Sequence, residues 1–139
     1  MTYLDGCILA ESKGYIVKDF VCPLKSFSVA VDGTYAIAIN HSAMDPDEDK
    51  TALFHELGHC ETDSFYNEDY PFDIRERHEN KAWKWAIKKL IPEDELDAAV
   101  ADGYTELWEL AEHFGVTEDF MRKAVCWYTH GNLATELYF

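Results

Sequence analysis

The residues of this sequence that are best suited to chemistry are His55, Glu56 and His59, which lie in the segment TALFHELGHC at positions 51–60. On a helix, two side chains four residues apart project from the same face, so both imidazole rings can reach one ion. Neutral imidazole is a common ligand of Zn²⁺. Glu56 points about 100° away from His55 and reaches a metal-bound water without being a ligand, as a general base must. The spacing therefore predicts the site of a metal-dependent hydrolase.

The residues before the motif are typical of the start of a helix. Asp45 suits the N-cap, Pro46 suits the first helical position, and Glu48 completes the pattern of a capping box. A chance match, with both histidines merely exposed on a surface, is expected in about 2 to 3 of a hundred chains of this composition. Because motif and cap agree, we interpret residues 46–60 as a metal-binding helix.

The buried stripe of this helix is expected to consist of Leu53, Leu57 and Cys60, with Ala52 beside it. Gly58 is unfavourable in the middle of a helix by about 1 kcal/mol relative to alanine. Its presence predicts that another backbone approaches the helix closely at this point.

A second helix is predicted over residues 74–91. Asp73 and Glu76 have the spacing of a second capping box, and Pro92 stops the helix. Glu79 stands at the head of a helical face that is otherwise small or apolar, consisting of Ala82, Trp83, Ala86 and Leu90.

Glu79 is the residue of this second helix that we expect to bind the metal. A buried glutamate without a partner is costly, and a metal ion offsets that cost. Together, His55, His59 and Glu79 supply the three protein ligands of a catalytic zinc site, with the fourth position left for water. Glu76 and His78 are nearby alternatives, and we favour Glu79 because it lies on the small-residue face.

The composition is that of a single domain over residues 1–139, since 47% hydrophobic and 14% aromatic residues are enough for a substantial core. No stretch approaches about 18 consecutive apolar residues, and the N-terminus has no signal-peptide pattern. We therefore expect a cytoplasmic protein without membrane contact. The four cysteines, Cys7, Cys22, Cys60 and Cys126, lack C-x-x-C spacing and are expected to be reduced and mostly buried.

The formal net charge of −15 argues against direct binding to nucleic acid, which requires a concentrated surface of Lys and Arg. A macromolecular partner of such an acidic chain would be basic. Solubility alone is the other explanation of the charge.

Residues 15–40 are rich in β-forming side chains. Alternating segments on both sides of Asp32-Gly33 predict a hairpin over residues 26–39 with a type I′ turn. We therefore expect an α+β fold in which a small antiparallel sheet packs on a zincin-like metal helix. An open edge of that sheet beside the metal would offer an extended peptide a strand to pair with.

The N-terminal segment, residues 2–13, is compatible with a short helix. Leu4 and Ile8 are expected to point inward, together with Cys7.

Residues 93–128 are predicted to form further helices, with Gly115 as the C-terminal cap of one and Thr117 as the N-cap of the next. Helix, glycine-containing turn and helix is also the layout of a DNA-binding helix-turn-helix. Glu118 and Asp119 would repel phosphate at the start of the second helix, so we interpret this pair as structural packing.

Four blocks of the sequence, taken in order, resemble the ImmA/IrrE family of metallopeptidases. They are HELGHCE at 55–61, RHENKAWKWAIKKLIP at 77–92, EL at 95–96 and GYTELWELAEHFGVT at 103–117. The similarity extends from about Tyr35 to Tyr128. An ordered series of blocks is far more specific than the H-E-x-x-H pattern alone.

The resemblance implies an intracellular, gluzincin-like zinc endopeptidase of the kind commonly carried by phages and mobile elements. Members of the family characteristically cleave a helix-turn-helix transcriptional repressor, so the expected partner is a basic DNA-binding protein. By the same resemblance, His55 and His59 match the ligand histidines and Glu56 matches the catalytic glutamate. Glu79 matches the third ligand, at the head of an E-x-x-A helix.

In such an enzyme, we expect Zn²⁺ to lower the pKa of its bound water toward about 7, so that Glu56 takes the proton and hydroxide attacks a peptide carbonyl. Glu56 then returns the proton to the leaving amine. The oxyanion needs a second donor, for which Tyr66, Tyr70 and His78 are unranked candidates. Two other functions stay open. They are a zinc hydrolase with a different target, and a metal-binding or inactive module that sequesters a regulator without cleavage.

Overall fold

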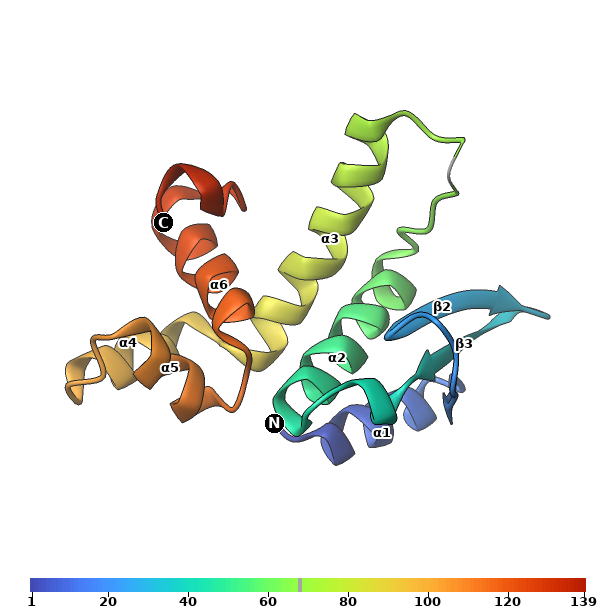
Figure 1. Cartoon of the computed structure of the whole chain (residues 1–139), viewed down its shortest axis with the longest axis horizontal. Helices are drawn as coiled ribbons and strands as arrows, with labels where there is room; N and C mark the ends of the chain where they lie inside the picture. The colour runs from blue at the N-terminus through green and yellow to red at the C-terminus, as the bar shows by residue number, and fades with distance from the viewer. Residues whose placement is uncertain (68) are drawn as a thin grey trace.

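The computed structural model describes residues 1–67 and 69–139. Within them, a mixed three-stranded sheet and six α-helices confirm the α+β fold class. In chain order the elements are α1 (Tyr3–Ser12), β1 (Ile16–Asp19), β2 (Ser26–Val31), β3 (Thr34–Ile39), α2 (Pro46–Thr62), α3 (Phe72–Leu90), α4 (Glu93–Ala101), α5 (Leu107–Phe114) and α6 (Glu118–His130), with short 3₁₀ helices η1 (His41–Ala43) and η2 (Thr135–Leu137). The sheet lies at one end of the molecule and α4, α5 and α6 at the other, with α2 and α3 between them (Figure 1).

The hairpin of β2 and β3 is antiparallel, as predicted, and its turn residues Asp32 and Gly33 have φ angles of 46° and 82°. These positive values are those of a type I′ turn. The sheet as a whole is mixed rather than antiparallel, because β1 pairs in parallel with β3 and the strand order is β1-β3-β2. The chain reverses direction twice between β1 and β3, and β3 takes the central position.

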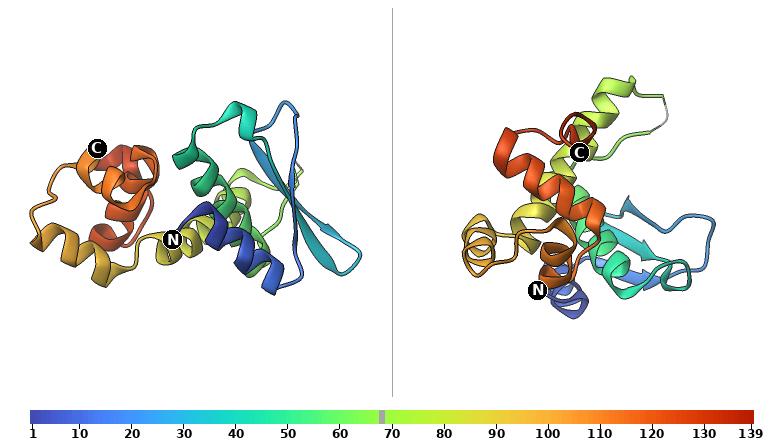
Figure 2. Two further views of the ribbon diagram at one scale, coloured as in Figure 1. Left: turned by 90° about the horizontal axis from the view of Figure 1, so that it is seen from below. Right: turned by 60° about the vertical axis from the view of Figure 1, so that its left-hand side comes forward.

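The two faces of the sheet differ in what they contact. Ile37 and Ile39 of β3 are buried, and the residues opposite them on β2 are Ser28 and Ser26. Helices α1 and α2 lie against this face (Figure 2). The alternate residues of β2 point the other way, and Val29 is 42% exposed. Strand β2 therefore presents hydroxyl groups, rather than its apolar side chains, to α2.

Helix α2 begins at Pro46, where the Asp45 carboxylate accepts a hydrogen bond of 2.9 Å from the Glu48 N–H. Asp45 is thus confirmed as the N-cap. The prediction that the Glu48 side chain completes a capping box by bonding back to the Asp45 N–H is wrong. The Glu48 carboxylate instead accepts a hydrogen bond of 2.8 Å from Lys25 Nζ, at the start of the hairpin. The helix continues two residues beyond the predicted end and stops at Asp63, which adopts the left-handed conformation.

Helices α2 and α3 pack closely where Gly58 faces Ala82. A Cβ atom at Gly58 would overlap the Ala82 carbonyl group, so the predicted close backbone approach is confirmed. Ala82 is fully buried. Helix α3 begins at Phe72 after Pro71, and the prediction of Asp73 as its N-cap is wrong, because Asp73 lies in the first turn. Proline presets a backbone φ compatible with an early helix start.

Helix α1 forms as predicted but buries a different face. Leu4 and Ile8 are 67% and 57% exposed, so the prediction that they point inward is wrong. Gly6 and Ala10 are buried instead. A Cβ atom at Gly6 would lie 2.7 Å from a side-chain carbon of Leu53, so the smallest residues of α1 allow it to lie against α2.

The C-terminal helices carry their own part of the core. Gly115 ends α5 with a φ of 64°, and the Thr117 hydroxyl accepts a hydrogen bond from the Phe120 N–H at the start of α6. Both caps are as predicted. Helix α5 begins at Leu107, and α6 ends at His130, two residues beyond the helical region predicted over residues 93–128. The residues that pack this part are Leu110, Ala111, Val116, Phe120, Met121 and Ala124.

All four cysteines are free thiols, and two of them, Cys60 and Cys126, are buried while Cys7 and Cys22 are half-buried. Among the described residues, none of the helices combines the length and the apolar character needed to cross a membrane.

Candidate metal centre

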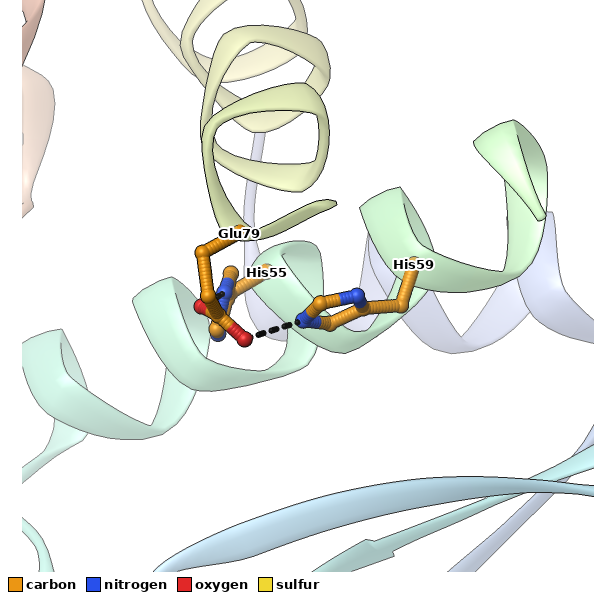
Figure 3. A group of neighbouring side chains, drawn as sticks. All are labelled: His55, His59 and Glu79. Carbon is orange, nitrogen blue, oxygen red and sulfur yellow. Dashed lines mark hydrogen bonds and ion pairs between the residues drawn. The ribbon is translucent and has the colours of Figure 1, made fainter. Parts of the chain in front are cut away.

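His55 and His59 lie one turn apart on α2, with ring centroids separated by 4.7 Å. Glu79 comes from α3 and points toward both rings (Figure 3). One carboxylate oxygen lies 2.8 Å from His55 Nε2, and the other lies 3.0 Å from His59 Nε2. One donor atom from each of the three residues fits within a span of 4.8 Å. Two helices thus bring together a candidate metal site from the three residues that the sequence analysis favoured.

The alternatives to Glu79 lie outside this cluster. Glu76 is exposed on α3, and His78 directs its ring toward aromatic side chains rather than toward the two histidines. The close contact of Gly58 with Ala82 places the first turns of α3 beside the motif, and Glu79 lies one turn before Ala82. The packing of small residues therefore selects which carboxylate reaches the histidines.

Each histidine ring is fixed by a second contact. The Nδ1 atom of His59 lies 2.7 Å from the Ser64 carbonyl oxygen. A carbonyl only accepts, so Nδ1 carries a proton and Nε2 faces the cluster. The ring of His55 stacks on Trp83, with centroids 3.8 Å apart and planes 10° from parallel. Both Nε2 atoms are thereby held toward Glu79.

The electrostatics of the cluster favour an ionised carboxylate. Burial raises the pKa of Glu79, but hydrogen bonds and charge attraction from His55 and His59 outweigh it and hold that pKa well below its usual range. Burial lowers the pKa of His59, but the hydrogen bond and the charge of Glu79 outweigh this effect. The net result is a pKa above the usual value.

Glu56 lies beside the cluster and is almost fully buried, with 6% exposure. Its two carboxylate oxygens accept hydrogen bonds from two serines of β2, 2.8 Å from the Ser26 hydroxyl and 2.7 Å from the Ser28 hydroxyl. Neither serine was predicted from the sequence as a functional residue. The alternation that placed Phe27 and Val29 on one face of the strand also placed Ser26 and Ser28 together on the other.

Of the three candidate donors for the oxyanion, Tyr66 is the one that reaches the cluster. Its hydroxyl donates a hydrogen bond of 2.8 Å to Glu79. Burial and this hydrogen bond raise the pKa of Tyr66 to about 12, so the hydroxyl keeps its proton at neutral pH. The rings of His78 and Tyr66 are 6.3 Å apart, and those of His78 and Tyr70 are 6.2 Å apart. His78 and Tyr70 are not among the residues that line the cleft at the cluster.

A cleft of about 500 Å³ opens over the cluster. It is lined by His55, Glu56, His59, Tyr66, Glu79, Phe65 and the β2 region from Leu24 to Ser28. A second hollow, of about 790 Å³, shares Lys25, Ser26 and His55 with it and extends toward α5 and α6. The two hollows therefore have lining residues in common at His55 and at the start of β2.

The donor set fits a divalent transition metal. Two imidazole nitrogens and a carboxylate are the three protein ligands found in one class of catalytic zinc sites, which leave a fourth position open. The Ser64 carbonyl behind His59 is the kind of outer hydrogen bond that orients a metal-binding imidazole. The cleft provides access to the open side of the cluster.

Comparison with protein families gives an independent result. The Peptidase_M78 model, described as the IrrE N-terminal-like domain, matches residues 13–125. Comparison with curated proteins gave no match. The matched region contains the sheet, both helices of the candidate metal site and most of α6. Zinc is typical of this family, and membership implies a metallopeptidase. The chain belongs to the IrrE N-terminal-like family of peptidases.

Proposed function

We propose that this protein is a zinc-dependent endopeptidase with His55, His59 and Glu79 as the metal ligands and Glu56 as the general base. The observation that carries the proposal is the convergence of two imidazole Nε2 atoms on the Glu79 carboxylate, at 2.8 and 3.0 Å, next to a buried glutamate. Membership in a peptidase family supports the same chemistry.

The residues divide the reaction between them. When bound, Zn²⁺ polarises a substrate carbonyl and makes a water molecule more acidic. Glu56 accepts a proton from the attacking water and later delivers it to the leaving amine. Tyr66, with its pKa raised to about 12, donates a hydrogen bond to the oxygen that gains negative charge. Of the three candidate donors, Tyr66 is supported by its direct hydrogen bond to Glu79.

Strand β2 provides a way to hold a peptide beside these residues. Among the described strands it lies at the edge of the sheet and pairs with β3 alone. An extended peptide can add to its free edge through main-chain hydrogen bonds. Residues 24–28 line the cleft that contains His55 and Glu56, so such a peptide would pass the reactive groups.

A protein substrate follows from the family, and a basic DNA-binding repressor is the partner we propose. The hollow beside His55 carries more acidic than basic side chains, and the whole chain has a net charge of −15. A basic protein would be attracted to such a surface.

The decisive experiment compares the wild type with Glu56→Gln. The variant should bind about one zinc per chain, as the wild type should, and lose at least about 100-fold in peptide cleavage, since general acid–base catalysis contributes 10²–10⁴-fold. Retention of a gene-regulatory effect by a zinc-loaded but inactive variant would instead favour an interaction module that sequesters its partner. Cleavage of an unrelated protein, with the repressor left intact, would favour a peptidase with a different target.

A further inference from the structure

We propose that Ser26 and Ser28 are positioning residues, which orient the Glu56 carboxylate from the strand that receives the substrate. This inference rests on the proposed function, because it assigns a role to the surroundings of its general base. The two hydroxyls donate to different oxygens of the same carboxylate, at 2.8 and 2.7 Å. Neither serine belongs to the H-E-x-x-H motif.

The two contacts restrict rotation of the carboxylate. A single hydrogen bond would leave the group free to turn about its last side-chain bond. Two donors at alternate positions of one strand fix the positions of both carboxylate oxygens. Glu56 is 6% exposed, so water has little room to compete for these oxygens. The packing of α2 against β2 therefore sets the orientation of the Glu56 carboxylate.

The fold holds the serines themselves in place. Ser26 lies opposite Ile39 and Ser28 lies opposite Ile37 in the antiparallel register of β2 with β3. Both isoleucines are buried in the core. A shift of this register by one residue would turn both hydroxyls away from Glu56 and replace them with Phe27 and Val29.

The location on β2 links the base to substrate binding. Main-chain hydrogen bonds of a sheet lie in its plane, whereas side chains project above and below it. A peptide added to the free edge of β2 would therefore leave the two serine hydroxyls on Glu56. Such a peptide would also restrain β2 and, through the serines, restrain the base.

A purely structural role for the serines makes a different prediction. Buried carboxylates need hydrogen-bond donors, and the two serines could stabilise the fold without affecting the reaction. In that case, their removal would lower stability and leave turnover by the folded enzyme unchanged. A positioning role requires a loss of kcat in enzyme that is folded and fully loaded with zinc.

The experiment uses Ser26→Ala, Ser28→Ala and the double variant, with Ser26→Thr and Ser28→Thr as variants that keep the hydroxyl. Ser12→Ala is a matched control, because it removes a hydroxyl that donates to the Leu9 carbonyl on α1. Zinc content, kcat and KM for a peptide substrate are measured for each. We expect kcat to fall about 10-fold for each alanine variant and about 100-fold for the double variant, since small misplacements of a reacting group reduce rates by such factors. KM and zinc content should stay near the wild-type values, and the threonine variants should recover most of the lost kcat.

A second measurement does not depend on activity. The Tm of the zinc-free protein is compared for Ser28→Ala, Glu56→Gln and the combination of the two. Direct contact predicts that the two losses are not additive. Wild-type kcat in the zinc-loaded double alanine variant would overturn the positioning role. A wild type that binds zinc but cleaves no peptide would contradict the proposed function instead. Additive Tm changes would overturn the contact between Ser28 and Glu56, whether or not the protein is active.

Discussion

The Nδ1 atom of His59 donates a hydrogen bond to the main-chain carbonyl of Ser64, five residues later, over 2.7 Å. This contact joins the end of α2 to the start of the following loop. It leaves Nε2 of His59 directed at Glu79, 3.0 Å away. One local turn of the chain therefore sets the tautomer and the direction of a candidate ligand, before any metal is considered.

The zinc-free protein should have a characteristic dependence of stability on pH. The pKa of His59 is raised above its ordinary 6.5, so its contribution is complete below pH 6.5 and is lost as the pH rises through the folded-state pKa. The pKa of Glu79 is lowered from its ordinary 4.5, so its contribution is present above pH 4.5 and is lost as the pH falls toward the folded-state pKa. The stabilisation by this pair should be largest between pH 4.5 and 6.5.

Thermal unfolding in the presence of a chelator measures this effect. The difference in Tm between wild type and Glu79→Gln should peak within that window and decline on both sides. A difference that is constant from pH 4 to pH 9 would contradict the ion pair. With zinc present, this difference in Tm should instead increase above neutral pH, because metal binding requires neutral imidazoles.

Local signals in the sequence were sufficient for the elements that carry the ligands. Asp45 and Pro46 mark the start of α2, Asp32-Gly33 marks the hairpin turn, and Gly58 marks the close contact of the two helices. Each of these signals depends on residues near one another in the chain or on the backbone freedom of a single residue. They were therefore predictable without knowledge of the tertiary structure.

Contacts between distant segments were not predictable in this way. The β-forming residues of β1 are compatible with parallel or antiparallel pairing, so the direction of this strand had to come from the structure. Glu48 pairs with Lys25, 23 residues earlier, in preference to closing its own capping box. In the sequence, Ser26 and Ser28 are simply polar residues that alternate with apolar ones. Their partner, Glu56, lies on another element. Competition between local and distant partners decides such cases.

Tyr66→Phe tests the proposed oxyanion donor. The variant removes only the hydroxyl that contacts Glu79, so zinc content should be unchanged and kcat should fall about 10- to 100-fold. Because the pKa of Tyr66 is raised to about 12, loss of its proton cannot limit the wild type below pH 10. The two pH–rate profiles should therefore have the same shape and differ in height.

Tyr70→Phe is the matched control for this experiment. Tyr70 belongs to the same loop region but does not line the cleft over the cluster. Its kcat should remain within about twofold of the wild type, as expected for a group outside the reaction. Equal losses in the two variants would assign Tyr66 a structural role.

Cleavage of a basic protein substrate should slow as the salt concentration rises. Carboxylates of the hollow beside His55, including Asp47 and Glu112, contribute to an attractive field that salt screens. We expect kcat/KM to fall about 10-fold between 50 and 500 mM salt, and Glu112→Gln to weaken this dependence. An uncharged peptide with the same scissile bond serves as the control. Equal salt dependence of the two substrates would contradict electrostatic recognition.

Replacing Glu79 should remove the metal. Glu79→Ala leaves two imidazoles without the carboxylate that joins α3 to α2, so its zinc content after dialysis against a chelator should fall from about one per chain to a small fraction. Glu76→Ala is the matched control, because it removes an exposed carboxylate from the preceding turn of the same helix and should retain the metal. Equal zinc retention in both variants would exclude Glu79 as a ligand. A folded wild type that takes up no zinc even after reloading would contradict the peptidase function itself, because the reaction proposed for Glu56 requires the ion beside it.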